Sequence, residues 1–242
     1  MLVFGEDEND RESIKILLGA LSPDLERRVQ TRRHPLVLIK GARPDEVPER
    51  AQRIAEAVDA ERVLAEVSCV FAHQDCDDVE PAHEKVATQI ESALQAVGCE
   101  AHAVAPAWEM EAWWFLWPDA VKAANPSWRS PNDYLGKNVG MIRDAKEELK
   151  RRVVPSNTKS GQRGFRGYRE SDAPRIAAEV ASRGLANEPQ ASSGSYDRFR
   201  RSVWACSAGA RPAADDAHPS GSTPHRGPEV ARARGSRKPS GR

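Results

Sequence analysis

The chain has 242 residues with equal numbers of acidic and basic side chains, so its formal net charge is zero. This length allows one sizeable domain with an appendage. A mean hydropathy of -0.64, with no apolar run near the roughly 20 residues that span a bilayer, argues against membrane insertion. The neutral balance gives no general attraction to nucleic acid, so any such binding has to come from local patches.

The N-terminus shows no basic region ahead of a long apolar stretch, so we expect no secretory signal and a cytoplasmic protein. Its four cysteines are Cys69, Cys76, Cys99 and Cys206. None has the Cys-x-x-Cys spacing of a zinc ribbon or a thioredoxin-type site. We therefore expect free thiols, mostly buried.

The first seventy residues alternate between short apolar runs and amphipathic segments. The apolar runs predict strands at 2–4, 36–39 and 63–71, the second of them buried on both faces. Apolar residues at helical spacing predict helices over 11–21 and 45–60.

An acidic loop at 75–80 comes next, then a helical pattern over 81–97 and a strand at 101–105. Strands that alternate with helices predict right-handed parallel crossovers. The sequence therefore predicts an α/β fold with a four-stranded, mainly parallel sheet and helices on both faces.

The pattern changes after residue 106, where an aromatic-rich helix is expected over 107–117. We expect its tryptophans to pack in a core rather than to stack nucleobases. Shorter helices are predicted at 144–151, 173–181 and 196–204.

These elements predict three parts of the chain. Residues 1–117 would form the α/β domain, and 118–207 a mainly helical extension packed on it. Residues 208–242 are rich in Arg, Pro, Gly and Ser and lack periodic apolar positions, which predicts a disordered basic tail.

Carboxylates follow two of the predicted strands. Glu6 comes directly after the first strand, and Asp75, Asp77 and Asp78 come directly after the third. The carboxyl ends of parallel strands meet at one edge, where ligands bind. Oxygen donors without paired histidines or cysteines suit magnesium, with manganese as the other candidate. Such an ion would support phosphodiester hydrolysis.

Helix capping is the simpler explanation for each acidic group taken alone. Asp7, Asn9 or Asp10 can cap a helix, and Asp78 can favour the dipole of the helix near Pro81. Only the two groups together favour a metal site.

These residues resemble the Toprim pattern, which carries topoisomerase, primase and OLD-type nuclease chemistry. The resemblance rests on Val3-Phe4-Gly5-Glu6 with Asp10 four residues later, and on Asp75-Cys76-Asp77. The segment from Pro106 to Trp113, with its Glu-x-Glu-x-Trp run, is similar to the Toprim-like domain of unknown function 4276. Related small nucleases serve bacterial antiviral defence.

The resemblance implies specific roles. Glu6 would be the general base or a metal ligand, Asp75 and Asp77 the principal ligands, and Glu111 a further acidic group in catalysis. Asp10 and Asp78 would be supporting ligands. The substrate would be nucleic acid, DNA or RNA, and a partner ATPase would control the enzyme. One departure is Asp7, where a glycine commonly follows the Toprim glutamate.

Two other functions remain open. The chain could be a catalytically inactive interaction module that binds an ATPase, which the neutral charge and the missing glycine favour. It could also be a phosphoacceptor domain that resembles a response regulator, with Asp75 as the acceptor. Lys146 could supply a cation to a phosphoryl group, although an exposed pairing residue is the simpler interpretation.

Overall fold

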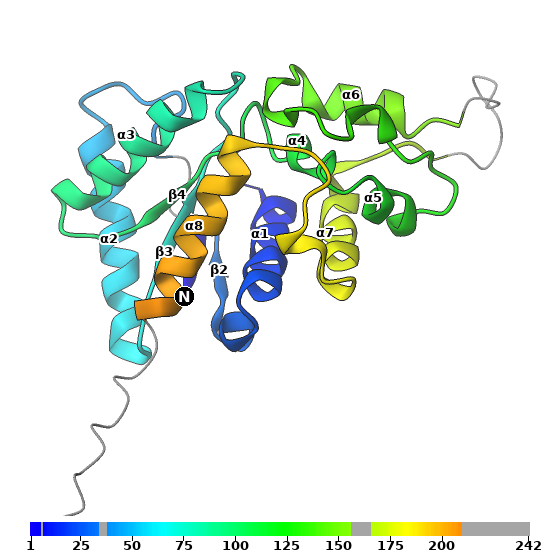
Figure 1. The fold of residues 1–242 in the computed structure, drawn as a ribbon. Coiled ribbons are helices and arrows are strands. Elements are labelled where there is room, and N and C mark those ends of the chain that lie inside the picture. The colour runs from blue at the N-terminus through cyan, green and yellow to red at the C-terminus, as the bar shows by residue number, and fades with distance from the viewer. Residues whose placement is uncertain (6, 34–37, 156–165, 210–242) are drawn as a thin grey trace, which may run out of the picture. The chain divides into compact units, whose positions relative to one another are not determined.

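Four short strands lie side by side in the computed structural model, which describes residues 1–5, 7–33, 38–155 and 166–209. They are β1 (Leu2–Phe4), β2 (Gln30–Arg32), β3 (Val70–His73) and β4 (His102–Val104), in the spatial order β2-β1-β3-β4. All three pairings are parallel, and helices cover both faces (Figure 1). The predicted α/β fold is confirmed.

The described residues form eight α-helices. These are α1 (Glu8–Leu21), α2 (Val47–Leu64), α3 (Ala82–Ala96), α4 (Glu111–Trp114), α5 (Pro118–Ala124), α6 (Ala145–Arg152), α7 (Ala173–Ser182) and α8 (Gly194–Gly209). Each of them is too short or too polar to cross a membrane.

The sheet separates two apolar cores, because successive strand residues point to opposite faces. Leu2 and Phe4 pack in a core with α2 and α3, whereas Val3 packs on the other side with α1 and α8 (Figure 1). The larger core contains Phe71 and Phe199 and joins residues on both sides of position 117. The described residues up to 209 belong to one compact unit. Residues 208–209, predicted as the start of the tail, are helical in α8, and the rest of the predicted tail, 210–242, lies outside the described residues.

The second strand differs from the prediction. It lies at 30–32 instead of 36–39, where Leu38 and Ile39 form bends and 36–37 lie outside the described residues. The side-chain oxygen of Gln74 accepts hydrogen bonds from the backbone N–H groups of Ile39 and Lys40, at 2.9 and 3.0 Å. These bonds replace a strand ladder, and the buried side chain of Leu38 still joins the core.

The third strand begins later than predicted. Helix α2 continues to Leu64, and β3 starts only at Val70. Val63 and Leu64 are 85% and 81% exposed, so the apolar pair that suggested a strand contributes nothing to the sheet. The charged Glu61 and Arg62, which precede this pair, both make ion pairs and belong to the helix.

The aromatic segment is not one helix over 107–117. Trp108 adopts a positive φ of 59°, only 111–114 are helical, and Pro118 starts α5. Trp113, Trp114, Trp117 and Trp128 are fully buried, as expected for core residues.

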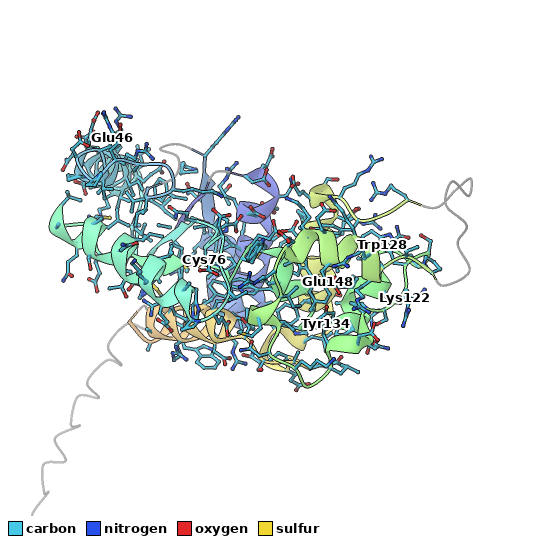
Figure 2. The ribbon with its side chains drawn as sticks, turned by 90° about the horizontal axis from the view of Figure 1, so that it is seen from above. Glu46, Cys76, Lys122, Trp128, Tyr134 and Glu148 are labelled. Carbon is cyan, nitrogen blue, oxygen red and sulfur yellow. A yellow bond between two sulfur atoms is a disulfide. The ribbon has the colours of Figure 1, made fainter. Side chains whose placement is uncertain are left out.

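The helical part packs through polar contacts as well as apolar ones. The indole of Trp128 donates to the carbonyl of Arg166 at 2.7 Å. The hydroxyl of Tyr134 donates to the buried carboxylate of Glu148 on α6, and Figure 2 shows the two side chains together.

The cysteines depart from the expectation of four free thiols. Cys69 and Cys206 form a disulfide with a Cα separation of 6.1 Å, while Cys76 and Cys99 are free. The pairing arises because α8 runs along β3 (Figure 1), so that Cys206, near the end of the helix, reaches Cys69 just before the strand begins.

Candidate functional site

The topology creates a crevice between the carboxyl ends of β1 and β3. The chain leaves β1 through α1, on one face of the sheet, and leaves β3 through α3, on the other. These connections run to β2 on one side and β4 on the other, so the order reverses between β1 and β3. Ligands in open α/β sheets bind at such a reversal.

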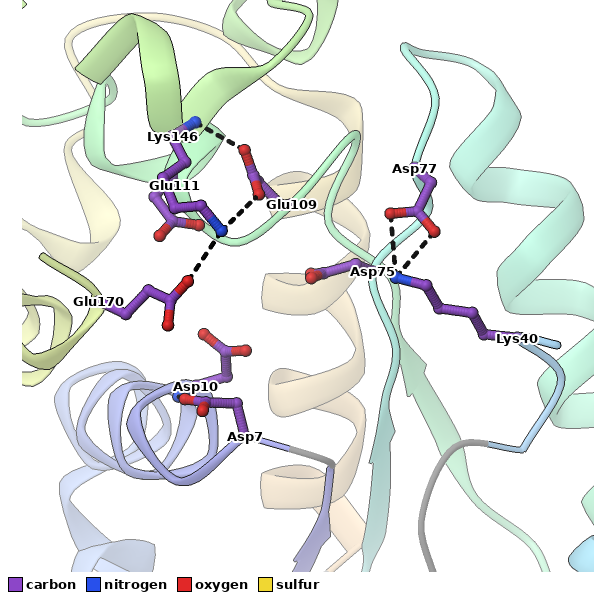
Figure 3. Close-up of a pocket in the computed structure, with 9 residues that line it drawn as sticks. All are labelled: Asp7, Asp10, Lys40, Asp75, Asp77, Glu109, Glu111, Lys146 and Glu170. Atoms are coloured by element: carbon purple, nitrogen blue, oxygen red, sulfur yellow. Dashed lines mark hydrogen bonds and ion pairs between the residues drawn. The ribbon is translucent and has the colours of Figure 1, made fainter. Parts of the chain in front are cut away.

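An acidic cavity of about 470 Å³ lies at this place (Figure 3). Seven carboxylates and two lysines line it, namely Asp7, Asp10, Lys40, Asp75, Asp77, Glu109, Glu111, Lys146 and Glu170. We call this set the acidic cavity. Its acidic groups come from four segments that are far apart in the sequence.

The start of α1 contributes two aspartates. Asp7 is the N-cap, because its Oδ1 accepts hydrogen bonds from the N–H groups of Asn9 at 2.7 Å and Asp10 at 3.3 Å. The pKa of Asp10 is raised to about 6, mainly by burial; the charges of Asp75 and Asp7 act in the same direction, and His73 acts against them.

The loop after β3 is fixed by backbone hydrogen bonds to the segment after β4. The N–H of Cys76 donates to Pro106 at 3.2 Å, and that of Asp77 donates to Trp108 at 2.9 Å. The N–H of Trp108 donates in return to Asp78 at 2.7 Å. This pairing continues the β3–β4 contact past the sheet and holds the two acidic segments together.

Asp75 faces the cavity, with the buried His73 behind it. Oδ1 of Asp75 lies 3.4 Å from Nε2 of His73 and has no hydrogen bond within the described part of the chain. Gly5 permits the close approach, since a Cβ there would lie 3.2 Å from the His73 ring. The end of β1 and the end of β3 therefore touch at this point.

Asp77 and Asp78 play different parts from Asp75. Asp77 lines the cavity at a φ of 55° and turns toward Lys40, whose Nζ lies 2.8 and 3.1 Å from its two oxygens (Figure 3). Asp78 is exposed, accepts the N–H of Val79 at 2.8 Å, and is absent from the cavity lining. The prediction of Asp78 as a ligand is not supported by this position.

Glu109 and Glu111 enter from the turn before α4 and from α4 itself. Oε1 of Glu109 accepts the N–H of Lys146 at 2.6 Å, at the start of α6. Glu111 is 5% exposed and accepts a hydrogen bond from the Tyr168 hydroxyl at 3.0 Å. Burial raises the pKa of Glu111 to about 8, and the charges of Glu109 and Asp10 act in the same direction.

Lys146 is the cation on this side of the cavity. Its Nζ lies 2.8 Å from Glu170 and 3.5 Å from Glu109. The hydrogen bond to Glu170 is the main reason why the pKa of Lys146 is raised above its usual value. Lys146 therefore stays charged and lines the cavity, rather than pairing along an exposed helix face.

The structure thus brings together Asp10, Asp75, Asp77 and Glu111 from the predicted set. Glu6 lies outside the described residues. Sequence reasoning missed four other lining residues: Asp7, Lys40, Glu109 and Glu170. The Glu109-x-Glu111 spacing was a usable signal for one of them, since both residues lie in the segment that comes after β4.

The arrangement suits a hard divalent cation. Every anionic donor is a carboxylate oxygen, the ligand type that a hard divalent cation prefers. In Figure 3 the carboxylates of Asp10, Asp75 and Glu170 point toward the same space.

A scan against protein-family models gave no match, and searches of curated proteins and of solved structures found no similar chain.

Proposed function

We propose that this chain is a magnesium-dependent phosphodiesterase of Toprim-like type that cleaves nucleic acid. The observation that supports the proposal is the convergence of Asp10, Asp75 and Glu111 on one cavity at the β1–β3 reversal. By the same resemblance, we propose that it works with a partner ATPase in bacterial antiviral defence.

The donor set fits magnesium or manganese on three counts. All anionic donors are oxygens. Asp75 lines the cavity, and its buried Oδ1, 3.4 Å from Nε2 of His73, makes no hydrogen bond among the described residues. Asp10 and Glu111 have raised pKa values, which a bound cation would lower again.

Within this proposal Asp75 and Asp10 would hold the ion, and Glu6, which directly follows β1 in the sequence but lies outside the described residues, would be a further ligand. Asp77 is a further ligand once Lys40 moves aside. When bound, the ion would polarise a phosphoryl oxygen and lower the pKa of an attacking water. Glu111, held by Tyr168, is assigned to proton transfer at the leaving oxygen.

The charge of the cavity makes phosphate binding depend on the cation. Seven carboxylates against two lysines would repel a phosphodiester. Lys146 and Lys40 are the side chains that can meet phosphate oxygens once divalent ions offset the acids. Binding of nucleic acid should therefore be weak in a chelator and strengthened by magnesium.

A second candidate, an inactive interaction module, is favoured by a different observation. Five of the lining acids already have structural partners. Asp7 caps α1, Glu109 accepts the N–H of Lys146, and Asp77 pairs with Lys40. Glu170 pairs with Lys146, and Glu111 accepts a hydrogen bond from Tyr168. Acids that cap a helix or pair with side chains and backbone groups of the same chain do not require a bound cation.

The deciding experiment compares two neighbouring aspartates. Labelled single-stranded and duplex DNA and RNA are incubated with the protein in magnesium, in manganese and in a chelator. Asp75→Asn should reduce cleavage by roughly 100-fold or more, because it removes a ligand of the ion. Asp78→Asn is the matched control, since that side chain belongs to the same loop but lies outside the cavity.

Calorimetric titration with magnesium completes the test. Binding that is lost in Asp75→Asn and kept in Asp78→Asn supports the proposal. A folded wild-type protein that binds neither metal contradicts it and leaves the interaction module as the better explanation. Equal losses in the two variants would also contradict the assignment of Asp75.

A further inference from the structure

Cys69, His102 and Cys206 meet at the opposite end of the sheet from the acidic cavity. Cys69 precedes β3 and His102 begins β4, so both lie at the amino ends of their strands. The two sulfurs and one imidazole nitrogen all lie within 4.8 Å of one another. We call this group the Cys-His-Cys cluster.

Strand register explains why these side chains converge. Phe71 pairs with His102 across the β3–β4 contact, and their rings lie 5.4 Å apart. Cys69 is two residues before Phe71 and shares its face of the sheet. On α8, Phe199 packs against Phe71 at 6.2 Å, and Cys206 lies two helical turns further along the same helix face.

Cys69 and Cys206 form a disulfide in this structure, and the same pair can also exist as two reduced thiols. A phosphine reductant opens the disulfide with balanced chemistry: phosphine and water supply two electrons and two protons, which gives two thiols and phosphine oxide. The same sulfurs then stand beside His102 as a soft ligand set. Thiolates with an imidazole are donors that zinc prefers, in contrast to the oxygens of the acidic cavity.

We propose that the reduced form of the protein binds one zinc ion through Cys69, Cys206 and His102. Binding displaces the two thiol protons, and water takes the fourth tetrahedral position. Zinc and the disulfide exclude each other, because both use the same sulfur electron pairs. Either one ties the end of α8 to the start of β3, so the contact between α8 and the sheet persists in both redox states.

The test uses cobalt as the spectroscopic probe. The full chain is reduced with phosphine, desalted under argon and titrated with Co²⁺ in excess Mg²⁺, so that any oxygen-ligand site is occupied. Bonds from thiolate to cobalt give a near-ultraviolet charge-transfer band that carboxylate sites lack. Zinc should abolish the band at one equivalent. Circular dichroism before and after reduction shows that the chain stays folded.

Three variants and a matched control assign the ligands. Cys69→Ser and Cys206→Ser should each remove the band or weaken zinc binding by at least tenfold, and His102→Gln should shift the band and weaken binding. Cys99→Ser is the control, because Cys99 is a buried free cysteine in the core on the other face of the sheet. Its titration should match that of the wild type.

The outcomes separate cleanly. A reduced, folded protein without the band overturns the zinc site, as does a band that persists in Cys69→Ser and Cys206→Ser. A reduced protein that unfolds and is not restored by zinc also overturns it, since the disulfide is then the sole function of the pair. None of these readouts involves cleavage, so they are independent of the proposed nuclease.

Discussion

The hydroxyl of Ser195 accepts a hydrogen bond from the indole of Trp113, 3.0 Å away, and another from the backbone N–H of Ala107 at 3.2 Å. These two donors lie on either side of Glu109 and Glu111 in the sequence. One buried side chain at the start of α8 therefore fixes both ends of the segment that brings these acids to the cavity.

Replacing this hydroxyl should destabilise the protein. Ser195→Ala leaves two buried donors without an acceptor, at a cost of about 2–4 kcal/mol in the free energy of unfolding. For a chain of this size that corresponds to a fall of roughly 5–10 °C in Tm. Ser192→Ala is the control, since Ser192 is exposed and, among the described residues, its hydroxyl makes a single long hydrogen bond, 3.4 Å to the carbonyl of Lys137. Thermal unfolding that is equal in the two variants would contradict this role.

Glu111 should make the metal-free protein less stable as pH rises. Its pKa is about 8 in the folded chain against 4.5 ordinarily, so the unfolded chain ionises first. The stability contributed by the protonated group is complete below pH 4.5 and is lost as pH rises toward 8. Asp10, with a pKa near 6, acts in the same direction at lower pH.

Glu111→Gln should remove most of that decline. Chemical unfolding in a chelator is measured at about pH 5, 6.5 and 8. The free energy of unfolding of the variant, relative to that of the wild type, should increase as pH rises. Added magnesium should restore the stability of the wild-type protein at high pH, because it binds the ionised carboxylates. If the free energy of unfolding changes with pH equally in variant and wild type across this range, the raised pKa of Glu111 is contradicted.

Lys146 should compete with a divalent ion for the cavity acids. Lys146→Gln removes a positive charge next to Glu109 and Glu170, so magnesium should bind about tenfold more tightly. If the Lys146 ammonium also contacts a phosphate group of the substrate, the cleavage rate of Lys146→Gln should fall although the metal binds more tightly. Calorimetry and cleavage assays separate the two effects. Lys150→Gln on the same helix, where the lysine pairs only with Glu147 among the described residues, should change neither.

Two adjacent glutamates on α6 should differ sharply in their effect on stability. Glu148 is 5% exposed and binds Tyr134, Arg151 and Arg152. Glu148→Gln should lower the free energy of unfolding by about 2–3 kcal/mol, because a buried charged network loses its anion. Glu147→Gln should have no measurable effect, since its pair with Lys150 is on the surface. Denaturant midpoints for the two variants check the difference.

The acidic edge could be predicted because topology alone brings it together. Parallel strands end at one edge, so Asp75 was expected beside the residues that follow β1 once the alternation of strands and helices was recognised. Asp10 was expected only from the Toprim resemblance. Glu111 was expected from a motif rather than from topology. Asp78 was also expected to be a ligand. The backbone turns at Asp77, which has a positive φ, and the side chain of Asp78 is exposed outside the cavity. Its position in the sequence does not predict that turn.

Other features depend on contacts that no local pattern records. The polar edge strand at Gln30 has no apolar signature, and the bends at Leu38 are held by the side chain of Gln74 from a distant segment. Glu170 and Lys40 reach the cavity by tertiary packing alone. The pairing of Cys69 with Cys206 spans 137 residues and requires α8 to be placed first.

The position of α8 sets a constraint on how the chain is made. Phe71, in the middle of the sheet, and Trp113, in the same core, both pack against Phe199 of this helix, the last in the described part of the chain. A ribosome releases these aromatic side chains long before it releases residue 199. A nascent chain that has not yet reached α8 therefore exposes the apolar surface that Phe199 later covers, and truncation before residue 194 should leave that surface open to contact with other chains.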